Sequence, residues 1–157
     1  MPKTSIMDML ADEVMSKDPT CVELWNDVRR LAAIFDADGI SGAPVIDRQG
    51  RLVGVVSKTD LLHRWLERSD DYDPRFLFEM MPEDGDGAEL IDPEAEAPRV
   101  EDFMTEDPIT AAPDDTLGTV AKRMAEASVH RLIIVDDEAP VGVITSMDIV
   151  RLLAESA

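Results

Sequence analysis

The chain has 157 residues, and its 34 acidic side chains outnumber 15 basic ones to give a formal net charge of −19. Such an acidic surface argues against nucleic acid as the partner, because contact with a phosphate backbone depends on Lys and Arg, and it also disfavours anionic membrane surfaces. With 45% hydrophobic residues, the chain can form one compact domain or two small repeats that share a core.

Cysteine usage and hydropathy indicate in which compartment the protein is expected. Cys21 is the one cysteine, so the chain forms no intrachain disulfide, and we expect no metal site built on cysteine. The N-terminus has no basic region followed by a long apolar run, and no stretch is apolar enough for a membrane span. We therefore expect a soluble, cytoplasmic protein without membrane insertion.

The first part of the chain predicts a β-α-β-β-α unit behind a short helix. Val28, Leu31 and Phe35 recur at helical spacing after Asn26 or Asp27, either of which is a good N-cap. In chain order, the expected elements are a helix over 5–14, a strand at 20–22, a helix up to 38, strands at 43–46 and 51–56 joined by a turn, and a helix from 58 to about 67.

Residues 69–99 have no counterpart elsewhere in the chain. Their acidic, Pro- and Gly-containing composition is typical of a flexible linker. Within them, the apolar patch Phe76–Met81 predicts a short helix packed on the protein's own surface or, alternatively, on a partner.

The last part of the chain predicts the same order of elements again. After a lead-in at 100–104, the expected elements are a strand at 109–111, a helix capped by Asp114 or Asp115, strands at 131–135 and 141–144, and a helix over 146–154. The fold class is therefore mixed α and β, and because the strands are short and nearly all apolar, we expect the sheets to be buried on more than one side.

The two parts are copies of one unit. Met15-Ser16-Lys17-Asp18-Pro19 returns 89 residues later as Met104-Thr105-Glu106-Asp107-Pro108, and Pro44-Val45-Ile46-Asp47 returns at the same offset as Ile133-Ile134-Val135-Asp136. The second copy has one residue fewer in its hairpin turn. Such a constant offset indicates a duplicated supersecondary unit, and two copies favour a pair packed about a pseudo-twofold axis. We divide the chain into a first repeat with its lead-in helix (1–68), an acidic insertion (69–99) and a second repeat (100–157).

The most informative repeated stretch is a strand, a hydroxyl residue and an acid three positions on. It reads Ser57-Lys58-Thr59-Asp60 in the first repeat and Thr145-Ser146-Met147-Asp148 in the second. Each copy can be a capping box and nothing more. A strand that ends at a helix N-terminus also presents amides and a positive dipole end, which suit a phosphate, while the carboxylate can accept hydrogen bonds from ribose hydroxyls.

His130 and Arg131 begin a predicted strand near the second of these sites. They suit a polyphosphate despite the acidic chain, because screening over about 8 Å at physiological salt lets nearby charges dominate. Alternatively, Arg131 pairs with surface carboxylates and His130 is a neutral hydrogen-bonding group. The first repeat has Ser41-Gly42 here, so the two sites are not expected to be equivalent.

These motifs resemble a tandem pair of cystathionine-β-synthase (CBS) domains, known as a Bateman module. The resemblance rests on the duplicated Met-Ser/Thr-x-Asp-Pro segment, the Gly-x-x-Ser/Thr-x-x-Asp segments from Gly54 and Gly142, and the duplication itself. The strand Val129-His130-Arg131-Leu132 is similar to that of the AMP-activated kinase gamma subunit. Ser41-Gly42 and the acidic insertion depart from the family pattern.

The resemblance implies clefts between the repeats for an adenosine-containing effector, such as AMP, ADP, ATP or S-adenosylmethionine, which would signal through the packing of a dimer. It implies no required cofactor and no metal. Asp60 and Asp148 would hold the ribose. The residues that would border the adenine lie at the entry to the first strand of each repeat: Thr20, Cys21, Ile109 and Thr110. The full set of implied ligand-binding residues is Thr20, Cys21, Ser41, Ala43, Ser57, Lys58, Asp60, Ile109, Thr110, His130, Arg131, Leu132, Thr145, Ser146 and Asp148.

The resemblance also implies a regulatory protein that forms a homodimer and controls an enzyme or transporter. The alternative is a structural interaction module whose clefts stay empty. Catalysis is not expected, because the chain has no Ser/His/Asp ordering, no metal-ligand spacing and no P-loop glycine pattern.

Overall fold

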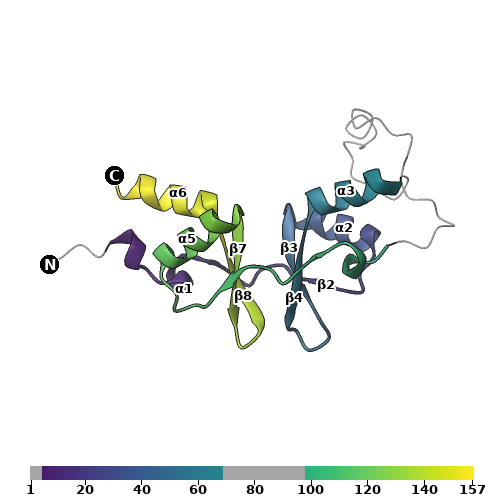
Figure 1. The fold of residues 1–157 in the computed structure, drawn as a ribbon, viewed down its shortest axis with the longest axis horizontal. Helices are drawn as coiled ribbons and strands as arrows, with labels where there is room; N and C mark the ends of the chain where they lie inside the picture. The colour runs from purple at the N-terminus through teal and green to yellow at the C-terminus, as the bar shows by residue number, and fades with distance from the viewer. Residues whose placement is uncertain (1–4, 69–97) are drawn as a thin grey trace. The chain divides into compact units, whose positions relative to one another are not determined.

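The computed structural model describes residues 5–68 and 98–157, which fold into two compact units (Figure 1). The repeat-2 unit takes its described residues from Met1–Pro19, Gln49–Leu52 and Asp107–Ala157. The repeat-1 unit takes its described residues from Thr20–Arg48 and Val53–Glu106.

The repeat-2 unit is built on a four-stranded sheet in the order β1-β8-β7-β6. β6 runs parallel to β7, and the other neighbouring strands are antiparallel. Figure 1 shows α5 and α6 on one side of the β7–β8 hairpin. The elements are η1 (Ile6–Asp8), α1 (Ala11–Val14), β1 (Ser16–Lys17), β6 (Thr110–Ala111), α5 (Leu117–Ala127), β7 (Arg131–Asp136), β8 (Ala139–Thr145) and α6 (Ser146–Glu155).

The repeat-1 unit has a matching sheet in the order β2-β3-β4-β5. Here β2 is parallel to β3, and β4 is antiparallel to β5. α2 and α3 lie on one side of the β3–β4 hairpin (Figure 1). The elements are β2 (Val22–Glu23), α2 (Val28–Asp38), β3 (Gly42–Ile46), β4 (Leu52–Ser57), α3 (Lys58–Arg68), η3 (Val100–Asp102) and β5 (Thr105–Glu106).

The lead-in segment of each repeat completes the sheet of the other repeat's unit. Ser16 of β1 is the register partner of Val143, while Thr105 of β5 is the register partner of Val55. The lead-ins also contribute to the cores, because Ala11 is fully buried in the repeat-2 unit and Val100 in the repeat-1 unit. Each compact unit therefore consists of most of one repeat together with the lead-in segment of the other repeat.

Each unit encloses its own apolar core between its sheet and its helices. Phe35 in the repeat-1 core and Leu117 in the repeat-2 core are among the largest fully buried side chains of the described residues. The buried side chains are Val22, Leu31, Phe35, Ala43, Val45, Val56 and Val100 in the first, and Ala11, Ala111, Leu117, Val120, Met124, Leu132, Ile134 and Ile144 in the second. The apolar residues that recur at helical or strand spacing in the sequence are thus the ones that are buried in the two cores.

The predicted β-α-β-β-α order is confirmed in both repeats, but the helix expected over 5–14 is wrong. The segment instead forms η1 and α1, and Leu10 between them is extended, with φ −80° and ψ 150°. The reason is tertiary: the carbonyl of Met9 accepts from the Leu117 amide at 2.7 Å, and Leu10 forms an isolated bridge with Thr116. These backbone contacts with the residues at the start of α5 outweigh the local helical pattern.

The expected cap of α5 is also wrong. Thr116, rather than Asp114 or Asp115, is the N-cap, and its hydroxyl accepts from the Thr119 amide at 3.3 Å. Asp27 caps α2 as predicted. The short strands β1 and β5 were not predicted, and the patch Phe76–Met81 lies outside the described residues, as does most of the acidic insertion.

Candidate ligand-binding site

The junction between β8 and α6 carries a complete capping box. The Thr145 hydroxyl accepts from the Asp148 amide at 3.2 Å, and Asp148 Oδ2 accepts from the Thr145 amide at 2.9 Å. The other carboxylate oxygen, Oδ1, lies 4.0 Å from the exposed guanidinium of Arg151 and accepts no hydrogen bond from the described residues. The cap therefore uses one oxygen of Asp148 and leaves the second as an acceptor.

The junction between β4 and α3 carries the same motif with one additional hydrogen bond. Asp60 Oδ2 accepts from the Ser57 amide at 2.8 Å and from the Ser57 hydroxyl at 2.9 Å. That hydroxyl also accepts from the Asp60 amide at 3.2 Å. The Ser57 hydroxyl is thus more fully used within the protein than that of Thr145, and it has no donor left for a ligand.

The first amides of α3 and α6 are less available than the sequence motif predicts. The Ser146 amide donates to the His130 carbonyl at 2.9 Å, and the Lys58 amide donates to the Ser41 carbonyl at the same distance. The third amide of each helix is bonded to the capping hydroxyl. This leaves the second amide, from Thr59 or Met147, for a phosphate oxygen.

These backbone bonds bring the residues predicted at the start of β7 to the capping box. Arg131 is the register partner of Thr145, and His130, which precedes it, is exposed. Arg131 is half-buried and already has an interaction within the protein. The backbones of His130 and Arg131 therefore lie beside Thr145 and Ser146 at the start of α6 within one unit.

Two residues of the predicted set contribute their side chains to the core. Leu132 is 1% exposed and Ala43 is 2% exposed. Their side chains pack in the two apolar clusters, so only their backbone groups can face a ligand. By contrast, Ser41 and Lys58 are exposed at the equivalent place in the repeat-1 unit.

The residues predicted to border an adenine lie at or just before the edge strands. Thr110 in β6 is the register partner of Ile133 in β7, and Ile109 before it is exposed. In the repeat-1 unit, the Thr20 hydroxyl donates to Asp38 Oδ2 at 2.9 Å. Burial raises the pKa of the neighbouring Cys21 thiol, because the thiolate is the form that loses hydration.

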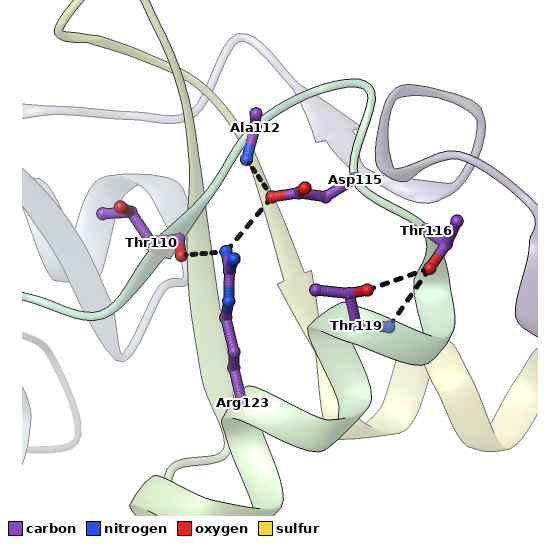
Figure 2. Close-up of polar contacts among 6 residues, drawn as sticks. All are labelled: Thr110, Ala112, Asp115, Thr116, Thr119 and Arg123. Atoms are coloured by element: carbon purple, nitrogen blue, oxygen red, sulfur yellow. Dashed lines mark hydrogen bonds and ion pairs between the residues drawn. The ribbon is translucent and has the colours of Figure 1, made fainter.

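Sequence reasoning missed a polar cluster beside β6, which Figure 2 shows. Arg123 Nη1 donates to the Thr110 carbonyl at 2.9 Å and lies 3.1 Å from Asp115 Oδ2. The same Asp115 oxygen accepts from the Ala112 amide at 2.8 Å. The acid was predicted as a helix cap, and only its spacing of eight residues from an arginine could have indicated a different role.

The described part of the chain contains neither a metal site nor a helix that could span a membrane. Residues 5–68 and 98–157 contain no group of three or more His, Cys, Asp or Glu side chains arranged to hold a metal ion. In the same ranges, every helix is too short or too polar to cross a membrane.

Comparison with known proteins identifies relatives of this chain in sequence and in fold. A protein of Methanocaldococcus jannaschii, MJ1426, is 32% identical over 154 residues, which cover 92% of this chain and 91% of that protein. The CBS domain pair of MJ0100, solved with 5′-methylthioadenosine and S-adenosyl-L-methionine, has a TM-score of 0.70 at 24% identity and covers 95% of this chain and 98% of that one. CBSX2 in complex with AMP has a TM-score of 0.68 at 23% identity, with coverage of 94% and 97%.

The family model of the CBS domain matches twice, at residues 11–67 and 100–155. Each match contains one of the two hydroxyl–acid motifs, and the two together span most of the chain. The chain therefore belongs to the CBS domain family, as a tandem pair.

Proposed function

We propose that this CBS pair is a regulatory protein that binds an adenosine-containing ligand at the two strand-to-helix junctions. The observation that carries the proposal is the gathering of His130, Arg131, Thr145 and Asp148 at the start of α6. A carboxylate oxygen outside the cap can accept from ribose hydroxyls, while a cationic side chain and an amide can hold a phosphate.

The two junctions are proposed to be unequal. The repeat-2 junction has His130 and Arg131 where the repeat-1 junction has Ser41 and Gly42. The Ser57 hydroxyl is also engaged as both donor and acceptor. The repeat-2 unit should therefore take the more highly charged ligand, and the repeat-1 unit a ligand with little charge beyond its nucleoside.

The class of ligand is supported by the structures that share this fold. Those of MJ0100 and CBSX2 contain S-adenosyl-L-methionine, 5′-methylthioadenosine or AMP. We therefore propose AMP, ADP, ATP or S-adenosylmethionine as the effector, acting without a cofactor. We assign the protein no catalytic step.

The effector is proposed to act through a homodimer in the cytoplasm, and thereby on an enzyme or transporter. α6 exposes Met147, Val150 and Leu153 at helical spacing, and each of these side chains is about half exposed. Such a stripe suits contact with a second copy. A ligand would shift the packing there only if it binds one arrangement better than the other.

The alternative is a structural interaction module with empty sites. It is favoured by the completeness of both capping boxes, which give Ser57, Asp60, Thr145 and Asp148 a sufficient role without any ligand. This alternative predicts that substitution of these residues changes stability alone.

A thermal-shift panel of AMP, ADP, ATP and S-adenosylmethionine, followed by calorimetry, separates the two functions. A ligand present at a hundredfold excess over its Kd adds about 2.7 kcal/mol to the free energy of unfolding. The regulatory proposal expects at least one member to raise the melting temperature. If none does at millimolar concentration, the structural alternative is the better account.

A further inference from the structure

The cluster of Arg123, Asp115, Thr110 and Ala112 fixes an edge strand. β6 has only two residues and lies at the end of the sheet, with β7 as its one neighbour. So short an edge strand is poorly held by one ladder. Arg123 donates to the carbonyl of Thr110, and Asp115 accepts from the amide of Ala112. The first residue of β6 and the residue that follows β6 are therefore both bonded to the same ion pair (Figure 2).

The loop that carries Asp115 is itself held firmly. The backbone carbonyl of Asp115 accepts from the Ala11 amide at 2.8 Å, and the Pro113 carbonyl accepts from the Asp12 amide at 3.0 Å. Thr116 then caps α5, the helix from which Arg123 extends. Asp115 is therefore a fixed anchor for the guanidinium rather than a mobile surface acid.

The repeat-1 unit has half of this arrangement. At the same offset of 89 residues, Asn26 replaces Asp115, and its Oδ1 accepts from the Glu23 amide at 2.8 Å, as Asp115 does from Ala112. Ile34 replaces Arg123 and packs against the apolar core. The turn is thus common to both units, while the arginine link to the strand is specific to the repeat-2 unit.

We propose that Arg123 is a positioning residue that holds the backbone at Thr110 in its ligand-bound conformation before the ligand arrives. This inference rests on the proposed function, because Thr110 is one of the residues proposed to border the adenine. A backbone fixed by Arg123 would make the repeat-2 site bind its ligand more tightly than the repeat-1 site. A site whose backbone is already fixed loses less conformational entropy on binding.

The Arg123–Asp115 pair is a weak candidate for a role in stability alone. Its side chains are 42% and 29% exposed, so solvent and salt screen the attraction. Removing it should lower the melting temperature by a few degrees at most, whereas binding at the repeat-2 site should weaken about five- to thirtyfold, the factor for ordering one backbone residue.

The test uses the full chain with Asp60→Asn, so that calorimetry with AMP reports mainly on the repeat-2 site. Arg123→Ile, which installs the repeat-1 residue, is compared with Lys122→Ala, which removes a charge from the exposed face of the same helix. A second variant, Asp115→Asn, copies Asn26 and keeps an acceptor for the Ala112 amide. We expect weaker AMP binding and a smaller preference for AMP over IMP in Arg123→Ile, an intermediate loss in Asp115→Asn, and less than a twofold change in Lys122→Ala.

The outcomes separate this inference from the function on which it rests. If the unaltered chain binds none of AMP, ADP, ATP and S-adenosylmethionine, the proposed function fails first. If the unaltered chain binds AMP and Arg123→Ile binds it equally well, with the same preference over IMP, then Arg123 is not a positioning residue. An equal loss of affinity in Arg123→Ile and Lys122→Ala would also overturn the inference, because it would reflect charge alone.

Discussion

Met15 of the lead-in segment packs directly over Gly142 of β8, within one compact unit. A Cβ built on Gly142 would lie 2.6 Å from Met15 Cγ and closer still to the sulfur, which is closer than Cβ atoms come to non-bonded neighbours in proteins. The repeat-1 unit has the matching pair, since a Cβ on Gly54 would lie 2.8 Å from Met104 Sδ. The glycine of each Gly-x-x-Ser/Thr-x-x-Asp motif thus leaves the space that a methionine from the other repeat's lead-in segment occupies.

The first prediction is that Gly142→Ala lowers the free energy of unfolding by about 1–3 kcal/mol, the usual cost of overpacking a close contact. Urea unfolding followed by circular dichroism measures it. In a Met15→Ala background, the same change should cost clearly less, because the long side chain that meets the new methyl group is gone. An equal cost in both backgrounds would show that the methionine is not the reason for the glycine.

The Met15–Gly142 contact also shows which part of the fold the sequence could not predict. Ser16-Lys17 and Thr105-Glu106 are equivalent segments, and β4 and β8 offer equivalent edges, each with a glycine for a methionine. Local pattern cannot decide between these pairings. The order of elements within a repeat was predictable because its caps, turns and apolar spacing are all local.

The same distinction applies to the candidate site. The capping boxes were predictable because their residues are three positions apart, and both are formed. The N-cap of α5 was not, because Asp114, Asp115 and Thr116 are all good caps. The lead-in segment decides which one is used, since it bonds the carbonyl of Asp115 and pairs with Thr116.

The second prediction concerns the ends of α2 and α5. Ser128 ends α5 in the left-handed region at φ 55°, where the first repeat has Gly39 at φ 61°. A Cβ costs about 1–2 kcal/mol in this region, and the greater freedom of glycine in the unfolded chain offsets part of the gain. Ser128→Gly should therefore stabilise the protein by about 0.5–1 kcal/mol in thermal or urea unfolding.

The matched control for the helix ends is Gly39→Ser, which should destabilise the protein by a similar amount. A Cβ at Gly39 would meet no atom within 4 Å, so the backbone conformation is the only expected cause. If both substitutions left stability unchanged, the left-handed caps would contribute nothing that depends on side-chain type.

The third prediction separates capping from ligand binding at Asp148. In Asp148→Asn, the amide oxygen can still accept from the Thr145 amide, but the second acceptor oxygen becomes an NH₂ donor. Stability should change little, while binding of a ligand with free ribose hydroxyls should weaken by about 1–3 kcal/mol. Calorimetry with AMP measures the loss.

Glu155→Gln, at the exposed end of α6, removes the same charge and should leave AMP affinity within about twofold, because surface charges are screened. Asp148→Ala should lose both affinity and the cap, so its melting temperature should fall as well. Equal AMP affinity in Asp148→Asn and the unaltered chain would remove Asp148 from the site.

The fourth prediction follows from the raised pKa of the Cys21 thiol. The folded chain keeps the thiol proton to a higher pH than the unfolded chain, whose pKa is about 8.5. The contribution of Cys21 to stability is therefore fully present below that value and is lost as pH rises through the folded pKa. Iodoacetamide should react more slowly with native protein than with urea-unfolded protein at pH 8, and Cys21→Ala should flatten the stability profile above pH 8.5.

The fifth prediction uses Cys21 as a reporter of the repeat-1 site. It is the one cysteine of the chain and precedes β2, in the segment proposed to border an adenine. A ligand bound there should slow alkylation of Cys21 several-fold, because it would cover the thiol. Asp60→Asn should abolish this protection while Asp148→Asn preserves it, since only Asp60 belongs to the same unit as Cys21. Protection that depends on Asp148 instead would mean that Cys21 reports on the repeat-2 site. A ligand that binds without slowing alkylation would place the adenine elsewhere.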